Sequence, residues 1–260
     1  MSDIHPSVGE GKSHDDMIKF WEDYSQQYSG EQQGDIPKRI VDRLFEVGVF
    51  QGNDCIMEIG SGPGTYSLEI APRARILVCM DSSPSMLDRL KSESKRRGIT
   101  NIECFVKDWT EYVPSKGYDA CIATLCPGTG SPESIERMEA TARRSCALVS
   151  WVVNHGDDLD AMIWKELGKD YGYGFRSSTA VQDWLSENGR DPKVEFFKTE
   201  IVKDIPISAL AEKERAAFAA YGKDIDAEGI IRKVLGSEID GDILHYRAVN
   251  EMKLIYWDSE

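Results

Sequence analysis

The sequence predicts one α/β domain built around a mostly parallel sheet. Apolar, strand-like runs alternate with helix-like segments between Asn53 and about Asn154, an order typical of parallel sheets. A glycine-rich turn at 60–64 follows the first run, and Asp81 ends the second. The length of 260 residues suits a single α/β unit. We therefore expect one sheet, with a ligand bound beyond the carboxyl ends of its strands.

Two helices are expected ahead of the sheet, in residues 1–48. Apolar and aromatic residues recur at helical spacing after a polar start; they are Met17, Phe20, Trp21, Tyr24 and Tyr28. A second helix is predicted from Asp35 to Gly48, because Pro37 suits its first turn and glycine commonly ends a helix.

Five strands are predicted in the alternating core, residues 49–156. Each is an apolar run, as a buried parallel strand requires. They lie at 56–59, 75–80, 101–106, 118–125 and 147–153. Residues 157–260 are expected to complete the same domain with helices near 159–167 and 181–188, a strand at 194–201, and two helices within 207–236. Residues 243–257 form either one bent strand or a hairpin that turns near Asn250.

The glycine-rich turn has the spacing Gly-x-Gly-x-Gly, from Gly60 to Gly64. The dinucleotide fingerprint would place its third glycine at position 65, where Thr65 stands. Glycine permits a close approach of the backbone to a ligand, because it has no side chain and tolerates positive φ. The turn therefore favours a bound ligand other than a dinucleotide, although a simple tight turn is the alternative.

A carboxylate stands at the end of the second strand, about 20 residues after the glycines, where a ribose diol is bound in nucleotide-binding folds. This residue is Asp81. The alternative is that Asp81 or Ser82 only caps the following helix, whose apolar face carries Met86, Leu87 and Leu90.

These strand ends, taken in order, resemble those of class I S-adenosylmethionine (SAM) methyltransferases, from about Trp21 to His155. Asp108 and Trp109 follow the third strand, as the adenine-binding residues do in that family. The resemblance implies a Rossmann-like sheet of seven mostly parallel strands with a reversed last strand, together with a helical cap. It also implies a SAM-dependent methyltransferase of the small-molecule type, with S-adenosylhomocysteine as the product. The fourth strand leads into Leu125-Cys126-Pro127-Gly128, without the Asn/Asp-Pro-Pro-aromatic motif of many amino-nitrogen methyltransferases.

The resemblance also implies which residues bind the cofactor. Those for its methionine part are Glu58, Gly60, Ser61, Gly62 and Gly64. Those for its adenosine part are Asp81 at the ribose, Ser82 and Met86 beside it, and Asp108 and Trp109 at the adenine. Leu125 would pack near the sulfonium. Trp21, Tyr24 and Tyr28 would cover the cofactor from the N-terminal helix, unless these aromatic residues only pack on the core.

No catalytic residue can be assigned from the sequence. Because SAM carries an activated methyl group, the main task of such an enzyme is to place a nucleophile in line with it. A general base is needed only if the acceptor arrives protonated. Cys126 and His155 are weak candidates near strand ends, and His245 on the last strand is weaker.

Composition limits the partners. The net charge of −14 argues against a nucleic-acid partner, since phosphate binding depends on Lys and Arg. No apolar run approaches the roughly 18 residues that a membrane span needs. The start of the chain lacks the features of a secretion signal, and the six cysteines show no C-x-x-C pair, so we expect a reducing cytoplasm and no metal. The sequence does not predict an oligomeric state.

Other functions stay open at this stage. A dinucleotide oxidoreductase would share Asp81 but not Thr65, while a non-catalytic SAM-binding module would share the whole motif set. For a methyltransferase, a protein or thiol acceptor is the alternative to a small molecule. We expect the helices of 157–191 and 207–236, together with residues 21–28, to enclose a pocket facing 126–130. The aromatic segment 171–175 is expected to line that pocket or to form a hinge.

Overall fold

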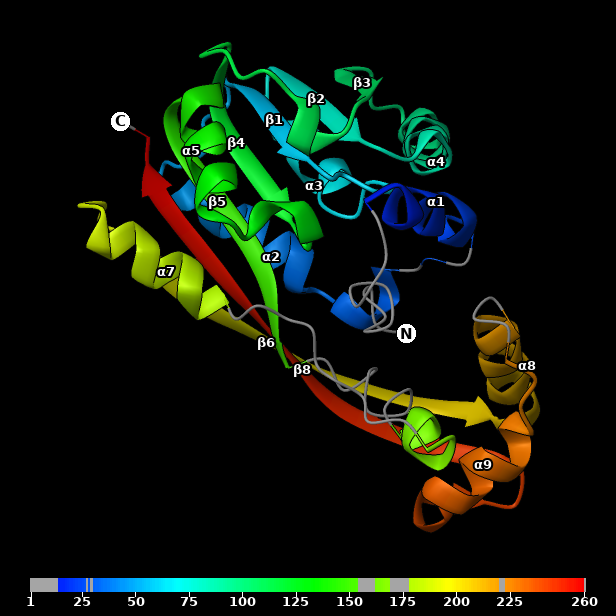
Figure 1. Cartoon of the computed structure of the whole chain (residues 1–260). Helices are drawn as coiled ribbons and strands as arrows, with labels where there is room; N and C mark the ends of the chain where they lie inside the picture. The colour runs from blue at the N-terminus through cyan, green and yellow to red at the C-terminus, as the bar shows by residue number, and fades with distance from the viewer. Residues whose placement is uncertain are drawn as a thin grey trace.

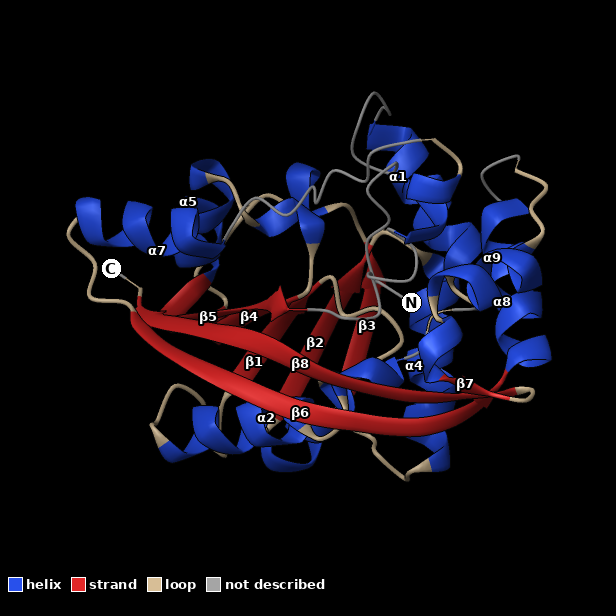
Figure 2. Cartoon of the chain, turned by 90° about the horizontal axis from the view of Figure 1, so that it is seen from below, coloured by secondary structure: helices blue, strands red, loops and turns tan. Residues whose placement is uncertain are grey.

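The computed structural model describes residues 14–26, 28, 30–153, 162–168, 178–219 and 223–259. Its strands are β1 (Cys55–Ile59), β2 (Ile76–Asp81), β3 (Ile102–Val106), β4 (Tyr118–Thr124), β5 (Ala142–Val153), β6 (Lys193–Pro206), β7 (Ile239–Asp240) and β8 (Ile243–Asp258). They form a single sheet in the order β3-β2-β1-β4-β5-β8-β6, with β7 paired to β8 outside this path. Figure 2 shows the sheet with helices on both sides.

The strand directions confirm the predicted fold class. Strands β1 to β5 are mutually parallel, and β8 is antiparallel to both β5 and β6. The last strand in the chain is therefore the reversed one, as expected. Seven strands make up the main path, and the two-residue β7 is an addition that the sequence did not predict.

The helices divide between the two faces of the sheet. They are α1 (His14–Tyr24), α2 (Ile36–Glu46), α3 (Ser67–Ile70), α4 (Pro84–Arg96), α5 (Pro132–Thr141), α7 (Ser178–Glu187), α8 (Ile207–Ala219) and α9 (Ala227–Val234). One buried cluster joins α2, α3 and α4 to the sheet, with Ile40, Ile70 and Leu87 among its members. A second cluster joins α5 and α7 to the other face through Ile135 and Leu185. Burial of these apolar stripes is the main stabilising contribution.

The last strand is one continuous element and not a hairpin. All of β6, from Lys193 to Pro206, pairs with β8, and the pairing passes Asn250 without a turn. These two strands run beyond the other strands, as Figure 1 shows. At their far end α8, α9 and residues 163–164 form a third apolar cluster of their own.

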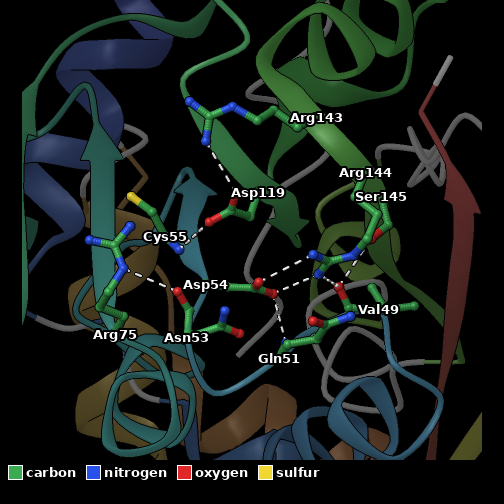
Figure 3. Close-up of polar contacts among 10 residues, drawn as sticks. All are labelled: Val49, Gln51, Asn53, Asp54, Cys55, Arg75, Asp119, Arg143, Arg144 and Ser145. Atoms are coloured by element: carbon green, nitrogen blue, oxygen red, sulfur yellow. Dashed lines mark hydrogen bonds and ion pairs between the residues drawn. The ribbon is translucent and has the colours of Figure 1, made fainter.

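A polar network closes the amino end of the sheet (Figure 3). Asp54, which is 2% exposed, accepts hydrogen bonds from Arg144 Nη2 at 2.6 Å and from the backbone N–H of Gln51 at 2.7 Å. The same Arg144 nitrogen donates to the carbonyl of Val49 at 2.9 Å. Asp119 accepts from the backbone N–H of Cys55 at 2.8 Å. The segment before β1 is thereby tied to β4 and β5.

Removal of the Asp54 carboxylate should destabilise the fold. In Asp54→Ala, the partly buried Arg144 guanidinium loses its counterion, so we expect the free energy of unfolding in urea to fall by about 2 kcal/mol. Asp191→Ala is the matched control, because Asp191 is 86% exposed and its salt bridge is to Lys193. Equal effects of the two substitutions would contradict a structural role for the Asp54 network.

Candidate functional site

A cavity of about 270 Å³ lies at the carboxyl ends of β1, β2 and β4. Its floor is formed by Gly60 to Pro63 together with Thr65 and Tyr66, and one wall is formed by Met80, Asp81, Ser82 and Met86. Helix α1 contributes Met17, Ile18 and Trp21. The remaining lining comes from Tyr28, Gln33, Lys107, Asp108, Trp109, Thr110, Thr124, Leu125, Cys126, Pro127 and Gly128. None of the described residues of α7, α8 or α9 lines it, while residues 157–161 and 169–177 of the segments expected to cover it lie outside the described part of the chain.

The three glycines of the turn have positive φ, but for different structural reasons. A Cβ atom on Gly60 would lie 2.6 Å from the sulfur of Cys126, and one on Gly64 would overlap Leu90 of α4. Nothing lies within 4 Å of the corresponding position on Gly62. Gly64 therefore permits packing and does not line the cavity, whereas Gly60 and Gly62 present their backbone to it.

The carboxylate of Asp81 joins the glycine turn to the start of α4. Its Oδ2 accepts from the N–H of Gly62 at 2.8 Å, and its Oδ1 accepts from the N–H of Ser83 at 2.9 Å. The N-cap of α4 is Ser83, whose Oγ accepts from the N–H of Met86 at 3.1 Å, so neither Asp81 nor Ser82 holds the cap position. Burial raises the pKa of Asp81, while the N–H donors of Ser83 and Gly62 oppose the increase. Each carboxylate oxygen keeps lone-pair capacity for a ligand.

Glu58 lies in β1 just before the glycine turn and does not line the cavity. It is fully buried, and it accepts hydrogen bonds from Ser67 Oγ at 2.5 Å and from Thr124 Oγ1 at 3.2 Å. These bonds tie β1 to α3 and to the end of β4. Burial raises the pKa of Glu58 to about 7.

Asp108 and Trp109 line the opposite end of the cavity, after β3. Asp108 accepts from the N–H of Thr110 at 2.6 Å and so caps a short 3₁₀ turn, η4 (Trp109–Glu111). Trp109 is 5% exposed, donates from Nε1 to Ser134 Oγ at 2.7 Å, and stacks on Tyr112 with ring centroids 5.5 Å apart. The tryptophan thus belongs both to the core and to the cavity wall.

Leu125 has a strained backbone, with φ of 52°, the one positive value among the described non-glycine residues. Its N–H donates to the carbonyl of Val149 at 3.0 Å, which holds the loop after β4 in place. Such strain costs on the order of 1–3 kcal/mol and persists where the surrounding structure determines it. The loop conformation brings Leu125 and Cys126 to the cavity.

The three candidate general bases lie in different places relative to the cavity. Cys126 lines the cavity, but burial raises the pKa of its thiol to about 12, so the thiol is protonated at neutral pH. His155 lies outside the described residues, as does the segment 171–175. His245 is on β8, away from the cavity lining, and its Nδ1 lies 2.8 Å from Asp204.

Helix α1 is attached to α4 by polar contacts that the sequence did not reveal. Glu22 accepts hydrogen bonds from the hydroxyls of Ser83, at 2.5 Å, and Ser85. Arg89 donates to the carbonyls of Ser25 and, at 3.0 Å, Tyr28. The attachment places α1 at the carboxyl ends of β1 and β2, beside α4 (Figure 1).

Of the aromatic residues expected to cover a cofactor, Tyr28 lines the cavity and Tyr24 does not. Tyr24 instead stacks on Phe20, with ring centroids 5.4 Å apart. Gln33 is a further lining residue that sequence reasoning missed. Its buried position carries no local signal, because the residue lies in a short turn between two helices.

Two other features concern the described residues as a whole. None of their helices is both long and apolar enough to cross a membrane. They also contain no group of three or more His, Cys, Asp or Glu side chains arranged to hold a metal ion.

Comparisons with known proteins agree with this geometry. Residues 56–147 match the family model described as a methyltransferase domain. An uncharacterised protein of Haemophilus influenzae is 24% identical over 202 residues, which are 71% of this chain and 74% of that protein. A protein of Methanosphaera stadtmanae named a probable ribosomal RNA small subunit methyltransferase A is 25% identical over 165 residues, 63% of this chain and 59% of that one.

A solved structure has a similar fold. It is the magnesium protoporphyrin IX methyltransferase of Synechocystis with bound S-adenosylhomocysteine (SAH), with a TM-score of 0.51 and 12% identity. The match covers 95% of this chain and 90% of that enzyme. The matched domain, the sheet order and the cavity at the strand ends agree: residues 56–147 form a methyltransferase domain, and the protein is a SAM-dependent enzyme with a Rossmann-like fold.

Proposed function

We propose that the cavity binds SAM in an extended pose and that the methyl group passes to a small-molecule acceptor. The methionine part would lie over Gly60, Ser61 and Gly62, and the adenine between Asp108 and Met86. The observation that carries this pose is the Asp81 carboxylate, which lines the cavity at the end of β2, the strand between β1 and β3 in the sheet. Ser82 and Trp109 would complete the adenosine site.

The side chains of the cavity fit this cofactor. Both oxygens of Asp81 already accept one backbone hydrogen bond each, so they are oriented for the adjacent hydroxyls of a ribose. Gly62 leaves the space above it open. The hydroxyl of Ser61, which is 5% exposed and lines the cavity, has no hydrogen-bond partner among the described residues. A buried polar atom of this kind is normally satisfied by a ligand or water.

Coverage of the cavity and the charge of the chain support a small acceptor. Trp21 and Met17 of α1 contribute to the wall of the site, and Glu22 fixes that helix to α4. A covered site suits a molecule that can be enclosed, since enclosure excludes water and holds reacting atoms in line. The net charge of −14 disfavours a polyanionic acceptor such as nucleic acid.

The chemistry requires little of the protein beyond placement. When bound, SAM supplies a methyl group activated by its sulfonium centre. Leu125 and Trp21 present apolar surface to the cavity, which disfavours ordered water beside the methyl group. Because the Cys126 thiol is protonated at neutral pH, it does not act as a general base there. An acceptor that already carries a free lone pair would need no base.

Loss of the Asp81 charge should weaken cofactor binding without loss of the fold. For Asp81→Asn we expect the affinity for SAH to fall about tenfold, because a charge-assisted contact to the ribose is lost. Calorimetric titration measures this, with Asp88→Asn on the exposed face of α4 as the control. An unchanged affinity in a folded variant would assign the ribose to another residue.

The acceptor class can be tested directly. The protein is incubated with methyl-labelled SAM and a cell extract that has been separated into small-molecule, protein and nucleic-acid fractions. We expect label to appear in the small-molecule fraction and to be strongly reduced with Asp81→Asn. Label transferred mainly to protein or to RNA would contradict the small-molecule proposal and would leave the methyltransferase assignment intact.

Glu58 should make stability decrease as the pH rises. Its pKa is about 7 in the folded chain against 4.5 for the free side chain, so between these values the folded state holds a proton that the unfolded state has lost. The stabilisation is complete below about pH 4.5 and is lost as the pH rises through 7.

The measurement is urea unfolding at about pH 5.5 and about pH 8, in the wild type and in Glu58→Gln. We expect the wild type to lose about 2 kcal/mol more than the variant, because about 1.5 pH units separate pH 5.5 from the raised pKa and each is worth about 1.4 kcal/mol. Glu103→Gln, at an exposed position of β3, should behave as the wild type does. If the free energy of unfolding changed with pH equally in the wild type and in Glu58→Gln, Glu58 would be charged in the folded state at both pH values, which would contradict the prediction.

A further inference from the structure

Gln33 is buried in the cavity wall with its amide only partly bonded. The residue is 1% exposed and lines the cavity. Its Nε2 donates to the hydroxyl of Tyr28 at 3.3 Å, while Oε1 has no hydrogen-bond partner among the described residues. A buried acceptor without a donor is unfavourable, so this atom is suited to meet a ligand that donates a hydrogen bond.

The turn that carries Gln33 is closely packed at both ends. It is the 3₁₀ turn η2 (Gly30–Gln33). A Cβ atom on Gly30 would lie 2.8 Å from Thr65 Oγ1, and one on Gly34 would lie 2.7 Å from Thr199 Oγ1. The turn is therefore packed between the glycine loop and β6, and a larger residue at either end would require the neighbouring threonine to shift.

This packing determines which end of the cavity Gln33 occupies. Strands β6 and β3 form opposite edges of the sheet. Asp108 follows β3, whereas the turn of Gln33 contacts Thr199 of β6 and Thr65 of the glycine loop. Gln33 thus lies at the glycine-loop end of the cavity, away from the adenine side.

Two polar side chains of the lining have an unbonded buried atom, the Gln33 amide oxygen and the Ser61 hydroxyl. An amide oxygen accepts only, and a hydroxyl can donate. Together they match a group that has one cationic donor and one anionic acceptor, as an α-amino acid has. With the ribose on Asp81, the amino-acid end of the cofactor extends toward these residues.

We propose that Gln33 Oε1 accepts a hydrogen bond from the α-ammonium group of SAM, and that this contact selects the intact cofactor over forms that lack the group. The inference rests on the proposed binding pose. It adds a specificity-determining residue outside the glycine turn and the strand ends.

Three ligands test the contact by calorimetry. They are SAH, its deamino analogue with hydrogen in place of the ammonium, and 5′-methylthioadenosine, which lacks the whole amino-acid end. For Gln33→Met, which keeps the length of the side chain and removes the amide, SAH affinity should fall on the order of tenfold, while the other two affinities change by less than about twofold. Gln51→Met, at an exposed position near the amino end of the sheet, should change none of them.

The wild type gives a second measurement that needs no variant. It should bind SAH on the order of tenfold more tightly than the deamino analogue, since only SAH satisfies the buried oxygen. Equal binding of these two ligands, an unchanged SAH affinity in Gln33→Met, or an equal loss for all three ligands would each overturn the proposal. Failure of the wild type to bind any adenosine ligand would instead contradict the binding pose on which the proposal rests.

Discussion

The site depends on one carboxylate, that of Asp81, which accepts backbone hydrogen bonds from Gly62 and Ser83. The turn between Gly60 and Gly64 has three residues with positive φ, and such flexible residues lose much conformational entropy when they are ordered. A fixed acceptor at the end of β2 offsets part of that cost. The same carboxylate lines the cavity, so one side chain both fixes the conformation of the loop and offers a hydrogen-bond acceptor to a ligand.

Glu58 provides the corresponding support beneath the turn. It lies in β1, directly before the glycines, and bonds to Ser67 and Thr124 in a setting without exposure to solvent. Its raised pKa reflects that burial. The two carboxylates have separate tasks, since Asp81 lines the cavity and Glu58 fixes the elements that form its floor and wall.

The cover of the cavity comes from the beginning of the chain. Helix α1 is attached to α4 through Glu22 and Arg89, and the turn of Gln33 is packed against Thr65. Helices α8 and α9 instead bury their apolar faces on each other and on the far ends of β6 and β8. None of the residues in that cluster lines the cavity. The long C-terminal strands therefore support α8 and α9 and not the cofactor site.

The fold class and the ligand-binding end of the sheet follow from the sequence alone, because the patterns that indicate them span only a few neighbouring residues. Strand periodicity, the glycine spacing and the acidic residue after the second strand predicted the α/β class and the ligand end of the sheet. The reversed last strand was implied by the resemblance of those same residues to a known family, and the structure confirmed it. The order of the strands in the sheet was not predicted.

Other features were decided only by packing. The sequence could not distinguish the roles of Gly62 and Gly64, since that difference depends on Leu90 of α4. It offered Asp81 or Ser82 as a helix cap only as an alternative to ribose binding, and packing gives that position to Ser83. It also left open a hairpin where β8 is one continuous strand. Glu22 and Arg89 make their contacts with residues 61 to 64 positions away, and no local pattern records such pairs. Local periodicity determines which segments become strands and helices, but only their assembly determines which side chains meet.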